Sequence, residues 1–235
     1  GLGGNCRPKG LKYGRMFDWP SLVISNDGRF TRVQRYFIPP GQIDQDTVTI
    51  NGEDAHHIVR VMRCQPGDTV IVCDNSGYEY EVRLETTDRG EVTGKIVSHL
   101  PAQSEPKLHV TLAPALLKGD KLEWVIQKGT ELGVYRFLPF QSERSVVKLS
   151  PNKAAKRCTR WQTIAKEAAE QAQRALLPEV DLPVHWEEIL RFIPQFDLAI
   201  IPYEREGSQS MPALWRSAGD IRNCLVIIGP EGGFE

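Results

Sequence analysis

The sequence lacks the features that mark several large classes of protein. No apolar run approaches the roughly 18 residues that a membrane-spanning helix needs. With 40% hydrophobic and 25% charged residues, the composition is that of a globular protein and not of a disordered chain. The five cysteines are scattered and form no C-x-x-C pair, which disfavours a disulfide framework and a zinc knuckle. These absences predict a globular protein of a reducing cytoplasm.

The first 27 residues also lack the apolar core of a secretory signal, although four basic residues precede the first acidic one, Asp18. We expect residues 1–27 to lie outside the fold, as a leader or disordered extension. The remaining chain is long enough for two domains, each with its own core.

Charge is distributed unevenly, although the net charge is only −1. Residues 106–178 carry 13 basic and 6 acidic side chains, whereas residues 179–235 carry 4 basic and 10 acidic ones. A segment as basic as the first suits a polyanion such as RNA, because Lys and Arg neutralise phosphates and release counterions. Solvated helix faces explain the same charge equally well.

Residues 28–104 have the pattern of short strands separated by turns. Three of the expected strands are 68–74, 78–85 and 91–100. The first two flank Asn75-Ser76-Gly77, a hairpin signal. The stretch 53–63 has helical spacing. Together these features predict a small antiparallel β-barrel.

From residue 105 onward, strands alternate with helices, which indicates an α/β domain with a mainly parallel sheet. The expected strands are 108–116, 134–140, 197–202 and 223–230, and the expected helices are 118–133 and 150–174. Ser150 is expected to cap the second helix, with Pro151 at its first position. Trp124 and Trp161 fall on apolar helix faces and are expected in the core.

Two of the apolar strands lead into loops, IIPYEREG (200–207) and IIGPEGG (227–233). In open α/β sheets, ligands bind beyond the carboxyl ends of the strands. The second loop lacks the lysine of a Walker A motif, and glycine allows close approach to its backbone. With Glu204 and Glu231 nearby, these loops suit a cationic nucleoside, S-adenosylmethionine. The alternative is a tight turn without a ligand.

The helix predicted over 150–174 ends in EAAEQAQR. Glu170 and Arg174 are four residues apart, so either they form an ion pair on one helix face or Arg174 projects into a site from the helix end. Gln171 is expected to share that site in the second case, and the spacing leaves both readings open.

Several basic residues are candidates for binding RNA. They are His56, His57, Arg60, Arg63, Lys118, Lys121, Arg144 and Lys148. Arg144 follows a strand, where it either contacts RNA phosphate or pairs with Glu143. No metal site is expected, because adjacent histidines on a helix point about 100° apart.

Five motifs follow one another along the chain: HHIVRVMRCQPGD, KGDKLEWVIQKGTELGV, PFQSERSVVK, RWQTIAKEAAEQAQR and IIGPEGG. Together they resemble the RsmE family of SPOUT-class methyltransferases, which methylate a uridine of small-subunit (16S) ribosomal RNA. The resemblance covers the chain from about Arg35 to Phe234. It implies a PUA-like RNA-binding β-barrel over 28–104 and an α/β SPOUT domain with a deep trefoil knot over 105–235.

The resemblance also implies a reaction and a set of site residues. Family members transfer the methyl group of S-adenosylmethionine to ring nitrogen 3 of uracil, and they act as homodimers. Glu170, Gln171 and Arg174 would face the target base. The implied cofactor-binding residues are Pro202, Tyr203, Glu204, Gly229, Pro230, Glu231, Gly232 and Gly233.

Uracil nitrogen 3 must lose its proton before it attacks a methyl group. A cation such as Arg174, aimed at the uracil carbonyl oxygens, would stabilise the anion, with Glu170 as the base or as the residue that orients Arg174. Relatives continue past GPEGG with a helix and a further motif, so part of the knot is expected to be missing from the sequence. Two alternatives are a non-catalytic RNA-binding or ribosome-assembly module and a SPOUT enzyme that methylates another RNA position.

Overall fold

The computed structural model describes residues 22–24, 30–88, 90–142, 150–202 and 210–230. The chain divides into two compact units, 1–33 and 34–235. In the first, β1 (Leu22–Ile24) pairs antiparallel with β2 (Phe30–Arg32). A strand therefore lies within residues 1–27, where no element was expected.

The second unit begins with a six-stranded sheet. Its strands, in spatial order, are β3 (Arg35–Phe37), β6 (Thr69–Cys73), β7 (Tyr78–Thr87), β8 (Glu91–Pro101), β5 (Thr47–Asn51) and β4 (Ile43–Asp44). The predicted hairpin is confirmed, because β6 and β7 pair antiparallel and both Asn75 and Gly77 have the positive φ that a tight turn needs. The purely antiparallel expectation is wrong for one pair, since β3 runs parallel to β6.

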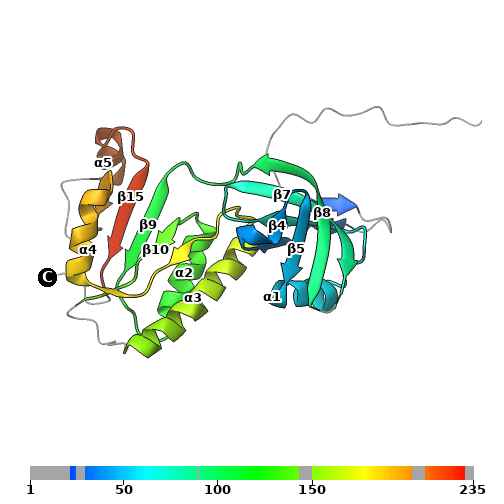
Figure 1. Cartoon of the computed structure of the whole chain (residues 1–235). Helices are drawn as coiled ribbons and strands as arrows, with labels where there is room; N and C mark the ends of the chain where they lie inside the picture. The colour runs from blue at the N-terminus through cyan, green and yellow to red at the C-terminus, as the bar shows by residue number, and fades with distance from the viewer. Residues whose placement is uncertain (1–21, 25–29, 89, 143–149, 203–209, 231–235) are drawn as a thin grey trace, which may run out of the picture. The chain divides into compact units, whose positions relative to one another are not determined.

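Alternating apolar side chains build the core of this barrel-like sheet, and a short helical segment covers one side of it (Figure 1). The segment consists of α1 (Gly52–His56) and a π-helical turn, η2 (His57–Val61), so the predicted helix is confirmed. Ala55 and Ile58 are fully buried against the sheet. The turn ends at Val61, and Arg63, two residues later, has a left-handed φ of 56°.

The rest of this unit is built on a five-stranded sheet that is parallel throughout, as predicted. Its spatial order is β12 (Glu179–Val180), β10 (Arg136–Phe137), β9 (His109–Pro114), β15 (Asn223–Ile228) and β14 (Leu198–Ile200). The chain leaves β9 in one direction through β10 and β12, and then returns to add β14 and β15 on the other side. The strand order therefore switches between β9 and β15.

The strand predicted over 134–140 is in fact two short strands. β10 ends at Phe137, and β11 (Phe140–Gln141) belongs to a separate pair with β13 (Val184–His185). Pro139 lies between them and has no N–H to donate to a ladder, which explains the interruption.

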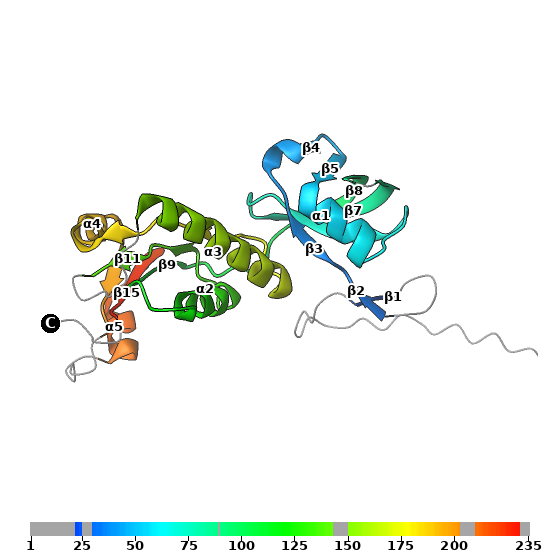
Figure 2. The ribbon, with the colours of Figure 1, turned by 90° about the horizontal axis from the view of Figure 1, so that it is seen from below.

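Helices cover both faces of the parallel sheet (Figures 1 and 2). On one face, α2 (Lys121–Glu131) and α3 (Pro151–Gln171) pack over Phe137, while α4 (Trp186–Phe192) packs on the other over Leu138. A last helix, α5 (Met211–Ser217), precedes β15. In the described part of the chain, no helix has the length and apolar character to cross a membrane.

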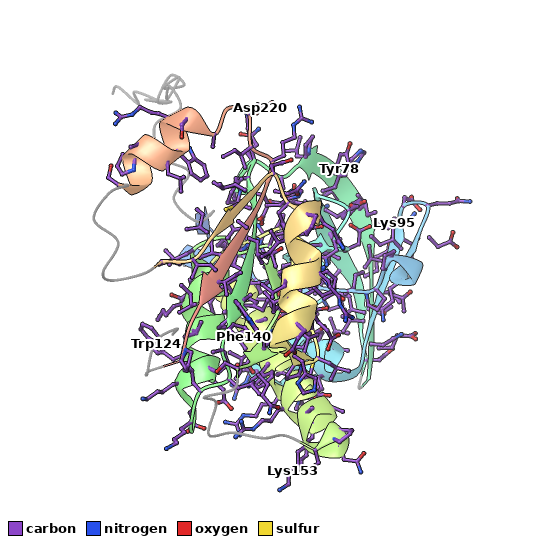
Figure 3. The ribbon with its side chains drawn as sticks, turned by 90° about the vertical axis from the view of Figure 1, so that its left-hand side faces the viewer. Tyr78, Lys95, Trp124, Phe140, Lys153 and Asp220 are labelled. Carbon is purple, nitrogen blue, oxygen red and sulfur yellow. The ribbon has the colours of Figure 1, made fainter. Side chains whose placement is uncertain are left out.

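The two tryptophans expected in the core behave differently. Trp161 is buried, as predicted, whereas Trp124 is 62% exposed and lies at the margin of the fold, away from the interior position of Phe140 (Figure 3). The core face of α2 is set by Leu122 and Ile126. Trp124 falls halfway between them in sequence, about 200° around the helix, so the prediction for Trp124 is wrong.

Candidate functional site

The carboxyl ends of β9, β15 and β14 form one edge of the parallel sheet. The chain after β9 is tied to this edge, because Ala115 N donates to the carbonyl of Ile228 over 2.8 Å and Leu116 N donates to that of Phe140 over 2.8 Å. The strand order switches at β9 and β15. Open parallel sheets bind ligands at such a switch point, beyond the carboxyl ends of the strands.

The predicted cofactor-binding residues that the structure describes lie at this edge. Pro202 is exposed, two residues after the end of β14, and Gly229 and Pro230 are half-buried immediately after β15. Because β14 and β15 are neighbours, the structure brings these residues to the same side of the sheet. The other predicted cofactor residues lie outside the described residues: Tyr203, Glu204, Glu231, Gly232 and Gly233.

The predicted catalytic residues come from the carboxyl end of α3. The helix ends at Gln171, earlier than expected, because Gln173 takes a left-handed φ of 58°. Adjacent residues on a helix point about 100° apart. Glu170 accordingly lies on the side of the barrel, whereas Gln171 lines a groove of about 350 Å³ between α2 and α3, next to Trp124.

Arg174 lies beyond the helix end and is 5% exposed. Its Nη1 donates to the carbonyls of Val134 and Thr130 over 2.6 and 3.3 Å, and its Nη2 donates to Glu105 Oε2 over 2.7 Å. The ion pair considered between Arg174 and Glu170 is not formed, because the helix has ended between them. A catalytic role for Arg174 stays a prediction, while its contacts in the structure hold together the ends of α2 and α3.

Glu105 completes this arrangement from the segment that joins the barrel to the parallel sheet. Its Oε1 accepts hydrogen bonds from the backbone amides of Ala175 and Leu176, over 2.8 and 3.0 Å. Arg35 of β3 adds a link from the barrel, donating to the carbonyl of Arg174 over 3.1 Å. The chain just after α3 is therefore fixed by groups from three separate segments.

Glu170 is surrounded by a different set of groups. Lys166 Nζ lies 3.8 Å from its Oε1 and 2.6 Å from Asp54 Oδ2 of α1. Burial raises the pKa of Glu170 to about 7, helped by the negative charge of Asp54 and opposed by Lys166 and by a hydrogen bond with the backbone of Phe37. A general base is most effective when its pKa lies near the operating pH, and the raised pKa of Glu170 meets this condition at neutral pH.

The predicted RNA-binding residues fall into separate places. His56 and Arg60 are exposed on α1 and η2, and Arg63 is exposed just after η2. His57 is half-buried, and its Nδ1 shares a hydrogen bond of 3.0 Å with the hydroxyl of Tyr36, so it is held against the barrel. Two further candidates, Lys118 and Lys121, are exposed where the chain passes from β9 into α2, and Arg144 and Lys148 lie outside the described residues.

Sequence reasoning missed the groups that contact these candidates. Lys166 stands four residues before Glu170, a spacing typical of a helix ion pair, so a local signal for it was present. Asp54 and Glu105 carry no such signal, because their partners Lys166 and Arg174 are 112 and 69 residues away.

Comparison with known families assigns both parts of the chain. Residues 104–235 match a family model described as an RNA methyltransferase domain, and residues 50–97 match one described as an RNA methyltransferase PUA domain. The fold and the site therefore belong to an RNA methyltransferase with a PUA domain.

Similar proteins narrow the class further. The chain is 42% identical to ribosomal RNA small subunit methyltransferase E of Bacillus subtilis over 210 residues, 86% of this chain and 82% of the relative. It is 34% identical to the protein of the same name from Synechocystis, over 87% of this chain and 66% of the relative. The chain belongs to the ribosomal RNA small subunit methyltransferase E family, the RsmE family of the sequence resemblance.

Solved structures agree with this assignment. The family member from Neisseria gonorrhoeae, solved with S-adenosyl methionine bound, has a TM-score of 0.73 at 27% identity and aligns over 86% of this chain and 82% of its own. A Legionella pneumophila protein solved with the same cofactor has a TM-score of 0.76 at 29% identity and aligns over 87% and 83%.

Proposed function

We propose that this protein transfers the methyl group of S-adenosylmethionine to ring nitrogen 3 of a uridine in small-subunit (16S) ribosomal RNA, in the cytoplasm. The observation that carries the proposal is the chain's membership of the ribosomal RNA small subunit methyltransferase E family. The structure adds Glu170, a half-buried carboxyl group between the PUA barrel and the methyltransferase domain, whose pKa is raised by burial to about 7. Methylation at nitrogen 3 requires the removal of a proton, and a base with this pKa suits that step at neutral pH.

The carboxyl edge of the parallel sheet suits the cofactor. Ile201 and Ile228, at the ends of neighbouring strands, are 43% and 40% exposed, and such apolar side chains can cover the adenine ring and the thioether chain. Gly229 leaves room for close approach to backbone groups, which can pair with the polar edge of adenine. We propose that Pro202, Gly229 and Pro230 border the cofactor, together with the remaining predicted loop residues: Tyr203, Glu204, Glu231, Gly232 and Gly233.

When bound, S-adenosylmethionine supplies an electrophilic methyl group on a sulfonium. Within one chain the end of α3 and the loops after β14 and β15 lie at opposite edges of the parallel sheet, so in the proposal Glu170 of one subunit of the homodimer acts beside the cofactor of its partner. There Glu170 accepts the proton from uracil nitrogen 3, and the nitrogen lone pair attacks the methyl carbon as its bond to sulfur breaks. Gln171, one position further along α3, orients the uracil from the side of the groove between α2 and α3. Arg174 keeps this helix end in place through Glu105 and the carbonyls of Val134 and Thr130; direct contact between Arg174 and uracil stays a prediction.

The RNA surface that we propose is centred on η2. Arg60 and Arg63 neutralise phosphates, and Val61 and Met62 between them are 59% and 38% exposed. Apolar side chains flanked by arginines suit an RNA segment with unstacked bases. This surface is joined to the candidate base by the Asp54–Lys166 contact. His56, exposed on α1, belongs to the same surface. We propose that Lys118, Lys121, Arg144 and Lys148 also contact the RNA.

We further propose that the enzyme acts as a homodimer, as the resemblance implies. In support, α2 presents apolar side chains to the surface: Trp124 is 62% exposed, and Leu132, just after the helix, is 84% exposed. The trefoil knot implied by the same resemblance stays a prediction.

Methyl mapping tests the function. The full-length protein is incubated with labelled S-adenosylmethionine and small ribosomal subunits, or free rRNA, from cells that lack the family enzyme, and the product is mapped by mass spectrometry. We expect a single 3-methyluridine. Methylation of a ribose or of another base would refute the position, and absence of cofactor binding by calorimetry would favour the non-catalytic RNA-binding module.

A further inference from the structure

A lysine lies between two carboxylates that come from different domains. Lys166 Nζ is 2.7 and 2.6 Å from the two carboxylate oxygens of Asp54 on α1, and 3.8 Å from Glu170 Oε1, one turn further along α3. The three side chains are only 29%, 19% and 20% exposed. Their interaction is therefore only partly screened by water.

Within the described residues, Glu170 Oε1 is buried and has no hydrogen-bond partner. The ammonium group of Lys166 is the cation that compensates its charge, at a distance of ion contact and not of a hydrogen bond. The same ammonium group is held more tightly by Asp54 of the PUA barrel. A change in the charge or position of Asp54 therefore changes the electrostatic environment of Glu170 through Lys166.

The other groups around Glu170 do not provide this compensation. Glu167 on α3 is negative, and Tyr36 of β3 is a neutral phenol whose pKa is raised by burial. The backbone of Phe37 supplies one hydrogen bond. His57, on η2, is hydrogen-bonded to the hydroxyl of Tyr36.

We propose that Lys166 is a positioning residue for methyl transfer: it joins the RNA-binding helix α1 to the end of α3 and compensates the charge of Glu170 while the target base is bound. The inference rests on the proposed function, because it takes Glu170 as the base. It adds that the ionisation of this base is set from the RNA-binding domain, by the way Asp54 and Glu170 share one cation.

Two substitutions are expected to act in opposite directions. Lys166→Met removes the compensating cation and leaves Glu170 beside Asp54, so the pKa of Glu170 rises. Asp54→Asn removes the competing negative charge, so Lys166 then compensates Glu170 alone. The pKa of Glu170 therefore falls. A charge at this distance typically shifts a pKa by about 1 to 3 units. A purely structural role would not give shifts of opposite sign.

The test is the pH dependence of single-turnover methylation between about pH 5 and pH 9, at saturating cofactor and RNA. We expect the midpoint of the acidic limb of the pH–rate profile to shift to higher pH by about one unit in Lys166→Met. In Asp54→Asn the midpoint should shift to lower pH. Lys166→Arg keeps the charge and should restore the wild-type limb. The matched control is Lys128→Met, which breaks an exposed ion pair with Glu131 on α2 and should move nothing.

A second measurement separates this inference from the proposed function. Titration of the Glu170 carboxyl carbon by NMR, assigned with Glu170→Gln, reports its pKa without catalysis. Unchanged pKa values in both Lys166→Met and Asp54→Asn, or shifts in the same direction, would overturn the role of Lys166. If Glu170→Gln kept the wild-type rate and pH limb, the role of Glu170 as base would fail instead. Should Lys166→Met not fold, Asp54→Asn alone still decides by its downward shift.

Discussion

The buried side chain of Arg174 makes several contacts, so we expect its removal mainly to lower the free energy of unfolding. The side chains of Arg174 and Glu105 are 6% and 11% exposed, and the guanidinium also satisfies the carbonyls of Thr130 and Val134. In Arg174→Ala these acceptors lose their donors in a site that water barely reaches. Breaking a buried pair by removing one partner costs about 3 to 5 kcal/mol, and we expect a loss of that size in the free energy of unfolding.

The assay is urea denaturation followed by circular dichroism, with methyl transfer measured on the same variants below their unfolding range. Glu105→Gln keeps the shape and one carbonyl acceptor for the amides of Ala175 and Leu176, so it should lose less stability than Arg174→Ala. Both should lower turnover, because both loosen the chain after α3. A stability change below about 1 kcal/mol in Arg174→Ala would refute this reasoning, since a buried unpaired carboxylate costs more than that. Loss of turnover in Arg174→Ala alone would instead support direct contact with the base.

Four further predictions follow from the site and the core. Methyl transfer should rise as pH increases through about 7, where Glu170 ionises, and Glu170→Gln should remove this limb and most of the activity in a rate-versus-pH measurement. Since the folded-state pKa of Glu170 is raised, the protein should lose stability as pH rises from about 4.5 to about 7; urea titrations of Glu170→Gln should show a flatter dependence over that range. Arg60→Ala and Arg63→Ala should each lower the slope of log affinity against log salt by about 0.7 for single-stranded RNA, as measured by filter binding. Gly129→Ala should destabilise by about 1 to 3 kcal/mol in thermal unfolding, because a Cβ there would come within 2.8 Å of the Phe137 ring.

Much of the fold was predictable because its signals are local. The alternation in 68–74 and 78–85 and the turn at Asn75 define the barrel hairpin without any knowledge of distant residues. The interruption at Pro139 also has a local signal, because proline lacks the N–H that a strand ladder needs. The prediction for Trp124 is wrong because this residue lies off the face of α2 that Leu122 and Ile126 bury, and apolar character alone does not decide burial.

The site was less predictable, because its decisive contacts are non-local. The end of α3 depends on the left-handed turn at Gln173, and glutamine gives no warning of such a conformation. The partners of Lys166 and Arg174 come from segments far away in the sequence. Residue types alone therefore favoured a Glu170–Arg174 pair, whereas the structure gives each residue a different partner.

The barrel and the methyltransferase domain share one small apolar cluster, in which Phe37 and Cys73 of the barrel pack with Ala169 and Ala175 at the end of α3. Unfolding of either domain would expose these side chains of the other domain to water, so the cluster couples the stabilities of the two domains. A ligand that binds only the barrel then protects the catalytic domain as well. RNA at a hundred times its dissociation constant would add about 2.7 kcal/mol to the stability of both.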